Sequence, residues 1–187
     1  MTTIKSQLIT LEEFLKLPET KPANEYIDGE IIQKPMPKGR HSRLQSKLGT
    51  AVNQVAEDQK IAYAFPELRC SFGNRSIVPD IAVSYWHRIP FNAEGEVPDD
   101  FTLHPDWTIE ILSPDQKPNK VIGNILYCLE YGCQLGWFID PGDRSILVFL
   151  PGQQPQLLQA GDSLPILKGI ELALTVEQMF GWLKMAI

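Results

Sequence analysis

The chain has 187 residues, of which 43% are hydrophobic and 21% charged, and its formal net charge is −6. This length suits one well-cored domain over residues 1–187, and the composition excludes wholesale disorder. The negative net charge argues against a protein that coats nucleic acid non-specifically, because such binding depends on neutralising phosphates.

No apolar run reaches membrane-spanning length and no secretory signal is visible, so we expect a cytoplasmic protein with no membrane association. The cysteines Cys70, Cys128 and Cys133 form no CxxC pair and are odd in number. They indicate reduced, structural thiols rather than a disulfide framework or a zinc site.

The N-terminal part of the chain predicts a short helix and then a hairpin. Thr10 and Glu13 match a capping box, which predicts a helix that ends before Pro18. Asp28-Gly29 is a turn signal between two short extended pieces within residues 24–33.

Apolar residues recur at helical spacing from His41 to about Gln59, which predicts a long helix. Five basic side chains and no acid lie between Glu30 and Glu57: Lys34, Lys38, Arg40, Arg43 and Lys47. A solvated face is the simplest interpretation of this run, unless it lies beside acidic groups.

Three extended segments follow at 61–66, 68–72 and 76–84. The last is apolar on both faces, which predicts one central strand carrying Asp80. Pro79 cannot donate to a strand ladder, so a bend or a free donor position is expected just before Asp80.

The rest of the chain predicts a second group of strands and helices. A long loop covers 85–105, and a buried strand with Glu110 follows at 106–112. We expect a helix over 118–132, a hairpin of strands at 134–140 and 144–150, a polar connection at 153–159, and a final helix that begins with the capping box at 175–178. This order describes one α/β domain around a mixed sheet.

Asp80 and Glu110 each lie in an apolar strand, where an unpaired carboxylate is costly unless a cation or hydrogen-bond donors meet it. Two such carboxylates on neighbouring strands suit Mg²⁺ or Mn²⁺, which accept one or two carboxylates and keep several waters. Such a site can orient and activate a water for attack on a phosphate. Glu25 is a third acid for this site, and Lys120 is the candidate for stabilising the developing charge.

Four of the candidate residues, Asp80, Glu110, Lys120 and His41, also have a structural interpretation. Asp80 could cap a turn, and Glu110 could pair with Arg69 or Arg75. Lys120 could be a solvated residue of a first helical turn. His41 could be a helix-start histidine whose hydrogen bonds are local.

Several motifs in order resemble the Uma-type family, whose members are bacterial proteins described as restriction endonucleases and similar to the PD-(D/E)xK nuclease superfamily. The motifs are NEYIDGE at 24–30, His41 opening a helix, VPDIAV at 78–83, TIEILSP at 108–114 and GWFIDP at 136–141. The resemblance covers nearly the whole chain. It implies a restriction-endonuclease-like fold, with a mixed central β-sheet flanked by α-helices.

The resemblance also implies a metal held by Asp80, Glu110 and the backbone carbonyl of Ile111, with Glu25 as the acid from the N-terminal part. The superfamily lysine would stand two residues after the acid, where this chain has Leu112. Uma-type proteins place it on the following helix, eight residues before a glycine, and that position is Asn124. Lys120 lies one helical turn earlier on the same stripe.

The leading hypothesis is therefore an endonuclease that uses Mg²⁺ or Mn²⁺ to hydrolyse DNA. Glu25, Asp80, Glu110 and Lys120 would be its catalytic residues, with Arg40, His41 and Arg43 contacting substrate phosphate. A homodimer is expected, since such folds often pair to address two strands. The competing hypothesis is a catalytically silent domain that keeps the fold for binding or oligomerisation.

Overall fold

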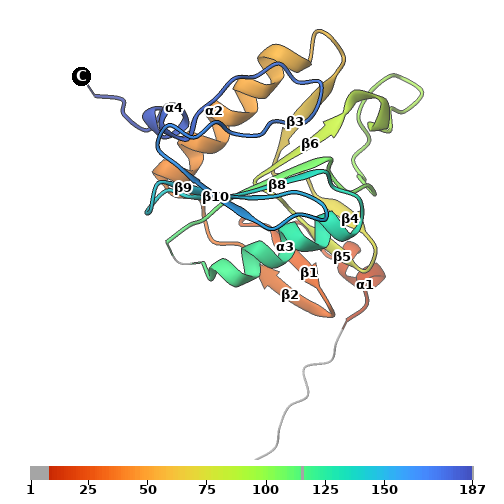
Figure 1. Cartoon of the computed structure of the whole chain (residues 1–187). Helices are drawn as coiled ribbons and strands as arrows, with labels where there is room; N and C mark the ends of the chain where they lie inside the picture. The colour runs from red at the N-terminus through yellow and green to blue at the C-terminus, as the bar shows by residue number, and fades with distance from the viewer. Residues whose placement is uncertain (1–8, 115, 187) are drawn as a thin grey trace, which may run out of the picture.

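Two β-sheets organise residues 9–114 and 116–186, which are the residues that the computed structural model describes (Figure 1). The larger sheet has six strands in the order β10 (Gln156–Gln159), β9 (Ser145–Phe149), β8 (Leu135–Asp140), β7 (Trp107–Ile111), β6 (Ile81–Tyr85) and β3 (Ala62–Pro66). The smaller sheet has four strands in the order β2 (Glu30–Gln33), β1 (Asn24–Ile27), β5 (Arg75–Ile77) and β4 (Cys70–Phe72). The helices are α1 (Leu11–Leu15), α2 (Gly39–Ala56), α3 (Pro118–Glu130) and α4 (Val176–Gly181), with a short 3₁₀ turn at Trp86–Arg88.

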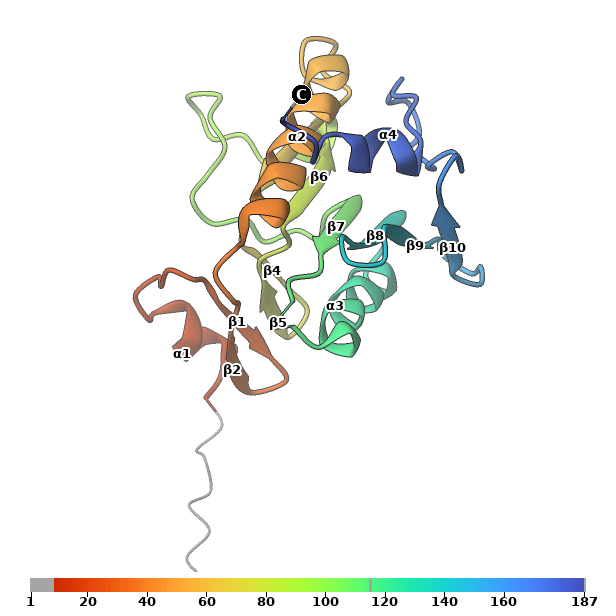
Figure 2. The same ribbon diagram turned by 90° about the vertical axis from the view of Figure 1, so that its left-hand side faces the viewer.

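The larger sheet is mixed, as the sequence predicts. Strands β7 and β8 run parallel and are joined by α3, whereas the other neighbouring pairs in this sheet are antiparallel. Figure 2 shows α2 and α4 on one face of this sheet and α3 on the other. The sheet is thus covered on both faces, which accounts for the apolar character of its central strands.

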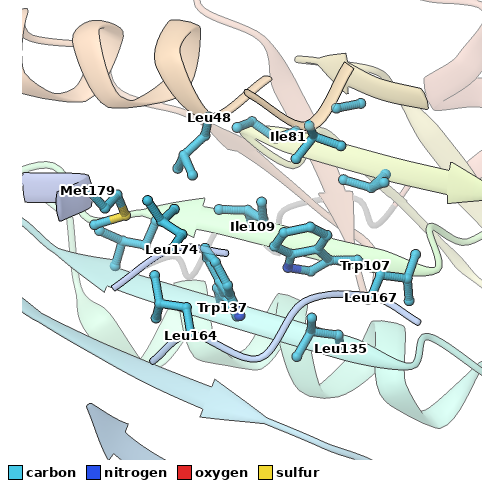
Figure 3. Close-up of a cluster of buried hydrophobic side chains, with 14 of the residues drawn as sticks. Leu48, Ile81, Trp107, Ile109, Leu135, Trp137, Leu164, Leu167, Leu174 and Met179 are labelled. Atoms are coloured by element: carbon cyan, nitrogen blue, oxygen red, sulfur yellow. The ribbon is translucent and has the colours of Figure 1, made fainter. Parts of the chain in front are cut away.

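Alternation along β7 divides its side chains between the two faces. Trp107, Ile109 and Ile111 join the main core with residues of α2 and α4. Figure 3 shows Trp107 and Ile109 packed in this core beside Leu48 and Met179. Glu110 lies on the opposite face and lines a pocket with residues of α3. The strand thereby fixes a carboxylate against α3, and the three apolar side chains hold its backbone in place.

The prediction of one continuous strand over 76–84 is wrong. Strand β5 ends at Ile77 and β6 begins at Ile81, and the two strands belong to different sheets. Pro79 has no N–H for a ladder, and the expected bend before Asp80 is a complete crossing between the sheets. Side chains provide hydrogen-bond partners for the backbone at this crossing. Glu25 accepts from Val78 N at 2.9 Å, and Gln45 donates to Asp80 O at 2.8 Å.

The polar connection predicted over 153–159 is also partly wrong, because it contains β10. This edge strand pairs with β9 through its backbone and leaves its side chains mostly exposed, so it has no apolar alternation to reveal it.

Local signals elsewhere are confirmed. Both predicted capping boxes form, at Thr10 of α1 and Thr175 of α4. The β1–β2 hairpin turns at Asp28 and Gly29, which both have positive φ, as such a two-residue turn requires. None of the helices in the described part of the chain has both the length and the apolar character needed to span a bilayer.

Candidate active site

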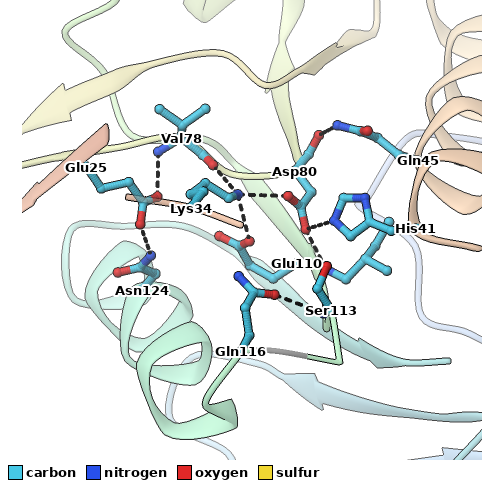
Figure 4. A network of polar contacts seen from close by, with 11 residues as sticks. Glu25, Lys34, His41, Gln45, Val78, Asp80, Glu110, Ser113, Gln116 and Asn124 are labelled. Carbon is cyan, nitrogen blue, oxygen red and sulfur yellow. Dashed lines mark hydrogen bonds and ion pairs between the residues drawn. The ribbon is translucent and has the colours of Figure 1, made fainter. Parts of the chain in front are cut away.

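Polar side chains from both sheets and two helices meet where the chain crosses from β5 to β6 (Figure 4). Asp80 ends the crossing and Glu110 lies on the neighbouring strand β7, with Ile81 paired to Ile109 between them. Lys34 directly follows β2. The two carboxylates are therefore brought together as predicted, and Lys34, which is not among the predicted site residues, lies between them.

Asp80 is 2% exposed and has hydrogen-bonding partners at both of its oxygens. Oδ1 accepts from Lys34 Nζ at 2.7 Å. Oδ2 accepts from the backbone N–H of Ile111 at 2.7 Å and lies 2.9 Å from His41 Nε2. Burial alone would raise the pKa of Asp80, but the Lys34 ammonium and His41 outweigh it and hold that pKa below its usual value.

Glu110 is as buried as Asp80, but its carboxylate has fewer hydrogen-bond partners. Its Oε2 lies 3.6 Å from Lys34 Nζ, and its Oε1 has no hydrogen-bond partner among the described residues. Burial raises the pKa of Glu110 well above its usual value, and the negative charge of Asp80 adds to this rise. The nearby ammonium opposes the rise without cancelling it.

Lys34 links the two sheets at this point. Its ammonium donates to Val78 O at 2.6 Å as well as to Asp80, and its side chain is only 13% exposed. Burial would lower the pKa of Lys34, but the charges of Glu110, Asp80 and Glu25 together raise it above its usual value. The lysine is therefore held in its charged form.

Glu25 completes the acidic group from the smaller sheet. Its Oε1 accepts from Val78 N, and its Oε2 accepts from Asn124 Nδ2 of α3 at 3.3 Å. Burial raises its pKa, although Lys34 and these two donors counteract part of the rise. Glu25 thus contributes charge to the cluster and also joins β1 to α3.

The cluster fits a divalent cation on two observations. Three carboxyl groups and only one ammonium share this cluster, so its acids outnumber the side chain that balances them. Glu110 also presents a buried oxygen that lacks a partner in the described chain. Within residues 9–114 and 116–186, no three His, Cys, Asp or Glu side chains are arranged to bind one metal ion together. The metal ligands available from Asp80 and Glu110 are carboxylate oxygens, the type that Mg²⁺ and Mn²⁺ prefer, and these ions keep several waters when a protein supplies few ligands.

The arginine pairing considered for Glu110 does not form. Arg69 pairs with Glu19 and Arg75 pairs with Asp28, so neither arginine neutralises Glu110. The partner of His41 is Asp80, which is distant in sequence.

A comparison with family models decides the classification. The model of the Uma2 family, described as "Putative restriction endonuclease", matches residues 11–177, which is most of the chain. The chain belongs to the Uma2 family. No curated protein matches it.

A crystal structure resembles this Uma2 chain throughout. It is described as a putative nuclease belonging to DUF820 from Anabaena variabilis ATCC 29413. The two sequences are 51% identical over 94% of this chain and 99% of the other, with a TM-score of 0.92. The predicted family and nuclease-like α/β fold are thereby confirmed.

The motif patterns place a lysine at one of two positions, and this Uma2 chain has no lysine at either. Leu112 and Asn124 occupy the two expected positions, and Asn124 is buried against Glu25. Lys120 is exposed on α3 and lines the same pocket as Glu110. Lys34, by contrast, contacts Asp80 directly.

A local signal for Lys34 was available in the sequence. The two-residue turn at Asp28-Gly29 sets the hairpin register, in which Glu25 pairs with Ile32. Period-two alternation then puts Lys34 on the same face of the hairpin as Glu25.

Of the three basic residues expected to contact DNA, only His41 lies beside the carboxylates. His41 lies in the cluster, whereas Arg40 donates to Pro141 O and Arg43 donates to Trp182 O. The structure therefore does not bring these two arginines to the carboxylates.

Two pockets flank Lys34 and share it with Pro35 and Gln116 as a common wall. The first, of about 540 Å³, includes Asp80 and His41 in its lining. The second, of about 790 Å³, includes Glu110, Lys117 and Lys120. Each of the two strand acids thus faces a different pocket.

Proposed function

We propose that this Uma2 protein is an endonuclease that depends on Mg²⁺ or Mn²⁺ and hydrolyses DNA phosphodiester bonds. The observation that carries the proposal is the buried cluster in which Asp80 and Glu110 flank Lys34, with negative charge in excess. Buried carboxylates of this kind are costly for a purely structural role, because well-packed apolar residues would serve stability better. The family and the resemblance to a nuclease structure support the same reaction class.

Asp80 and Glu110 are the residues that would hold the cation. When bound, a divalent cation polarises a phosphate and lowers the pKa of a bound water. Ile111 N–H and His41 fix the orientation of the Asp80 carboxylate, and β7 fixes Glu110. The protein therefore presents both acids in set positions before substrate arrives.

Lys34 supplies the positive charge next to the reacting phosphate. An ammonium in a site from which water is largely excluded stabilises the negative charge that develops on phosphate oxygens during hydrolysis. We assign this role to Lys34 in place of Lys120, because Lys34 is in contact with Asp80 and Lys120 is exposed. Lys117 and Lys120 would instead hold the DNA backbone along the second pocket.

A cleavage assay tests the proposal on supercoiled, linear and single-stranded DNA with Mg²⁺ or Mn²⁺. We expect metal-dependent cleavage that falls by about 100-fold or more in Glu110→Gln and Lys34→Met, the usual effect of losing a group that stabilises the transition state. Lys168→Met removes an exposed lysine away from the cluster and should retain wild-type cleavage. Lys120→Met should lose less activity than Lys34→Met.

The competing function is a binding domain without catalysis. The ammonium already placed against Asp80 favours that alternative, because it neutralises part of the charge without a metal. Cleavage that persists unchanged in Glu110→Gln would contradict the proposed active site. DNA binding without any cleavage by the wild-type protein would support the silent domain.

A further inference from the structure

The ammonium of Lys34 lies among oxygens of the kind that bind a hard metal ion. It is 2.6 Å from the carbonyl oxygen of Val78, 2.7 Å from Asp80 Oδ1 and 3.6 Å from Glu110 Oε2. Two carboxylates and a backbone carbonyl are typical ligands of Mg²⁺ and Mn²⁺. The protein therefore has an oxygen-lined cation position that its own lysine occupies.

Asp80 has one oxygen to offer to a metal. Its Oδ2 already accepts from Ile111 N–H and contacts His41 Nε2 at 2.9 Å. Its Oδ1 is the oxygen that Lys34 holds. A divalent cation that binds Asp80 through Oδ1 therefore meets the ammonium at the same atom.

We propose that Lys34 and the divalent cation compete for the position between Asp80 and Glu110, so that metal binding displaces the ammonium into the adjoining pockets. This inference rests on the proposed function for the identity of the metal. A doubly charged ion and an ammonium repel each other strongly at contact distance in a site with little water. The lysine consequently limits metal affinity in the free protein.

The displaced side chain has space beside it. Lys34 is part of the wall between the two pockets, and its stem is long and flexible. An ammonium that leaves Asp80 Oδ1 enters a pocket whose lining includes His41 on one side or Lys117 and Lys120 on the other. There it is available to a phosphate, so metal and DNA each favour binding of the other.

Calorimetric titration of Mn²⁺ into DNA-free protein tests the competition. Lys34→Met retains the length of the side chain and removes its charge. It should bind Mn²⁺ about tenfold or more tightly than the wild type, because the competing charge is gone. Lys168→Met is the matched control and should bind as the wild type does. Equal or weaker binding by folded Lys34→Met overturns the inference.

A second measurement uses the wild-type protein and does not depend on how well the variant folds. Lysines are acetylated by a water-soluble active ester during a Mn²⁺ titration, and each site is quantified by mass spectrometry. Acetylation of Lys34 should rise several-fold as the metal saturates, while that of the exposed Lys168 stays constant. Unchanged or reduced acetylation of Lys34 at saturation overturns the inference.

The two proposals fail in distinguishable ways. Neither measurement uses DNA cleavage, so a wild-type protein that binds Mn²⁺ and shows the Lys34 response without cutting DNA contradicts the proposed function alone. Cleavage that depends on Glu110, combined with equal Mn²⁺ affinity in the wild type and Lys34→Met, contradicts the competition alone.

Discussion

Lys34 lies among three buried carboxylates, so its removal leaves negative charge in a region that water reaches poorly. Loss of one partner of a buried ion pair typically lowers stability by about 3–5 kcal/mol. We expect Lys34→Met to lower the free energy of unfolding by about this amount, measured by urea denaturation without added metal.

A second substitution shows how much of the stability lost in Lys34→Met comes from the lost charge rather than from altered packing. Glu110→Gln keeps the shape of the side chain and removes one of the charges that Lys34 balances. Its introduction into Lys34→Met should recover part of the lost stability. Losses that simply add would mean that the two residues do not interact.

The three cysteines permit a prediction about reactivity. Burial raises the pKa of Cys70 to about 12 and that of Cys133 to about 12, and it raises the pKa of Cys128 well above the ordinary value. The thiolate is the reactive form, and little of it exists at mildly alkaline pH when the pKa is raised. A disulfide reagent such as DTNB should therefore titrate the three thiols only after denaturation. Rapid reaction of the native protein would contradict this expectation.

Strand β8 and helix α3 approach each other closely at Gly136, which pairs with Thr108 of β7. A Cβ added at Gly136 would overlap Ile125 Cγ2 of α3, so one of the two elements would have to shift. Gly136→Ala should destabilise the protein by about 1–3 kcal/mol, the usual effect of overpacking. Ile125→Ala in the same chain should relieve part of that loss, as thermal or urea unfolding would measure.

Gly49 provides the matched control for that substitution. It lies within α2, and a Cβ added there meets nothing within 4 Å. Gly49→Ala should stabilise the protein by about 0.5–1 kcal/mol, because alanine loses less backbone entropy in a helix. Destabilisation at Gly49 would show that the result at Gly136 does not report on the β8–α3 contact.

The elements that the sequence predicts well are those with local signals. The apolar period of α2 and the caps at Thr10 and Thr175 depend on near neighbours, so they can be recognised before the fold is known. The crossing at Pro79 could be predicted as a bend, but not as a change of sheet. Which sheet a strand joins depends on partner strands that are distant in sequence, and the local pattern of residues does not reveal them.

In the candidate site too, residues with a local signal can be predicted, whereas contacts between distant parts of the chain cannot. Asp80 and Glu110 were predicted because apolar neighbours make a lone acid conspicuous in a strand. Lys34 is not predicted as a site residue, because a lysine between a strand and a proline is ordinary in a solvated loop. Its partner Asp80 is 46 residues away along the chain, and only the packed fold brings the two together.

At the scale of the whole molecule, the polar cluster joins the two sheets. Lys34 and Glu25 come from the smaller sheet, while Glu110 belongs to the larger one. Loss of Lys34 should therefore loosen the β1–β2 hairpin before it affects β7 and β8. Hydrogen exchange of Lys34→Met should be faster than wild type over residues 24–33 and unchanged over 135–140. Equal acceleration in both ranges would indicate a global loss of stability instead.

The crossing of the chain from β5 to β6 has a consequence for inactivation. Chemistry would require groups from both sides of a junction, whereas the main apolar core lies within the larger sheet and its helices. Pressure or mild denaturant should then abolish the proposed DNA cleavage while tryptophan fluorescence still reports a folded interior, since Trp107 and Trp137 lie in that core. Inactivation would then result from a reversible separation of the two sheets that precedes global unfolding.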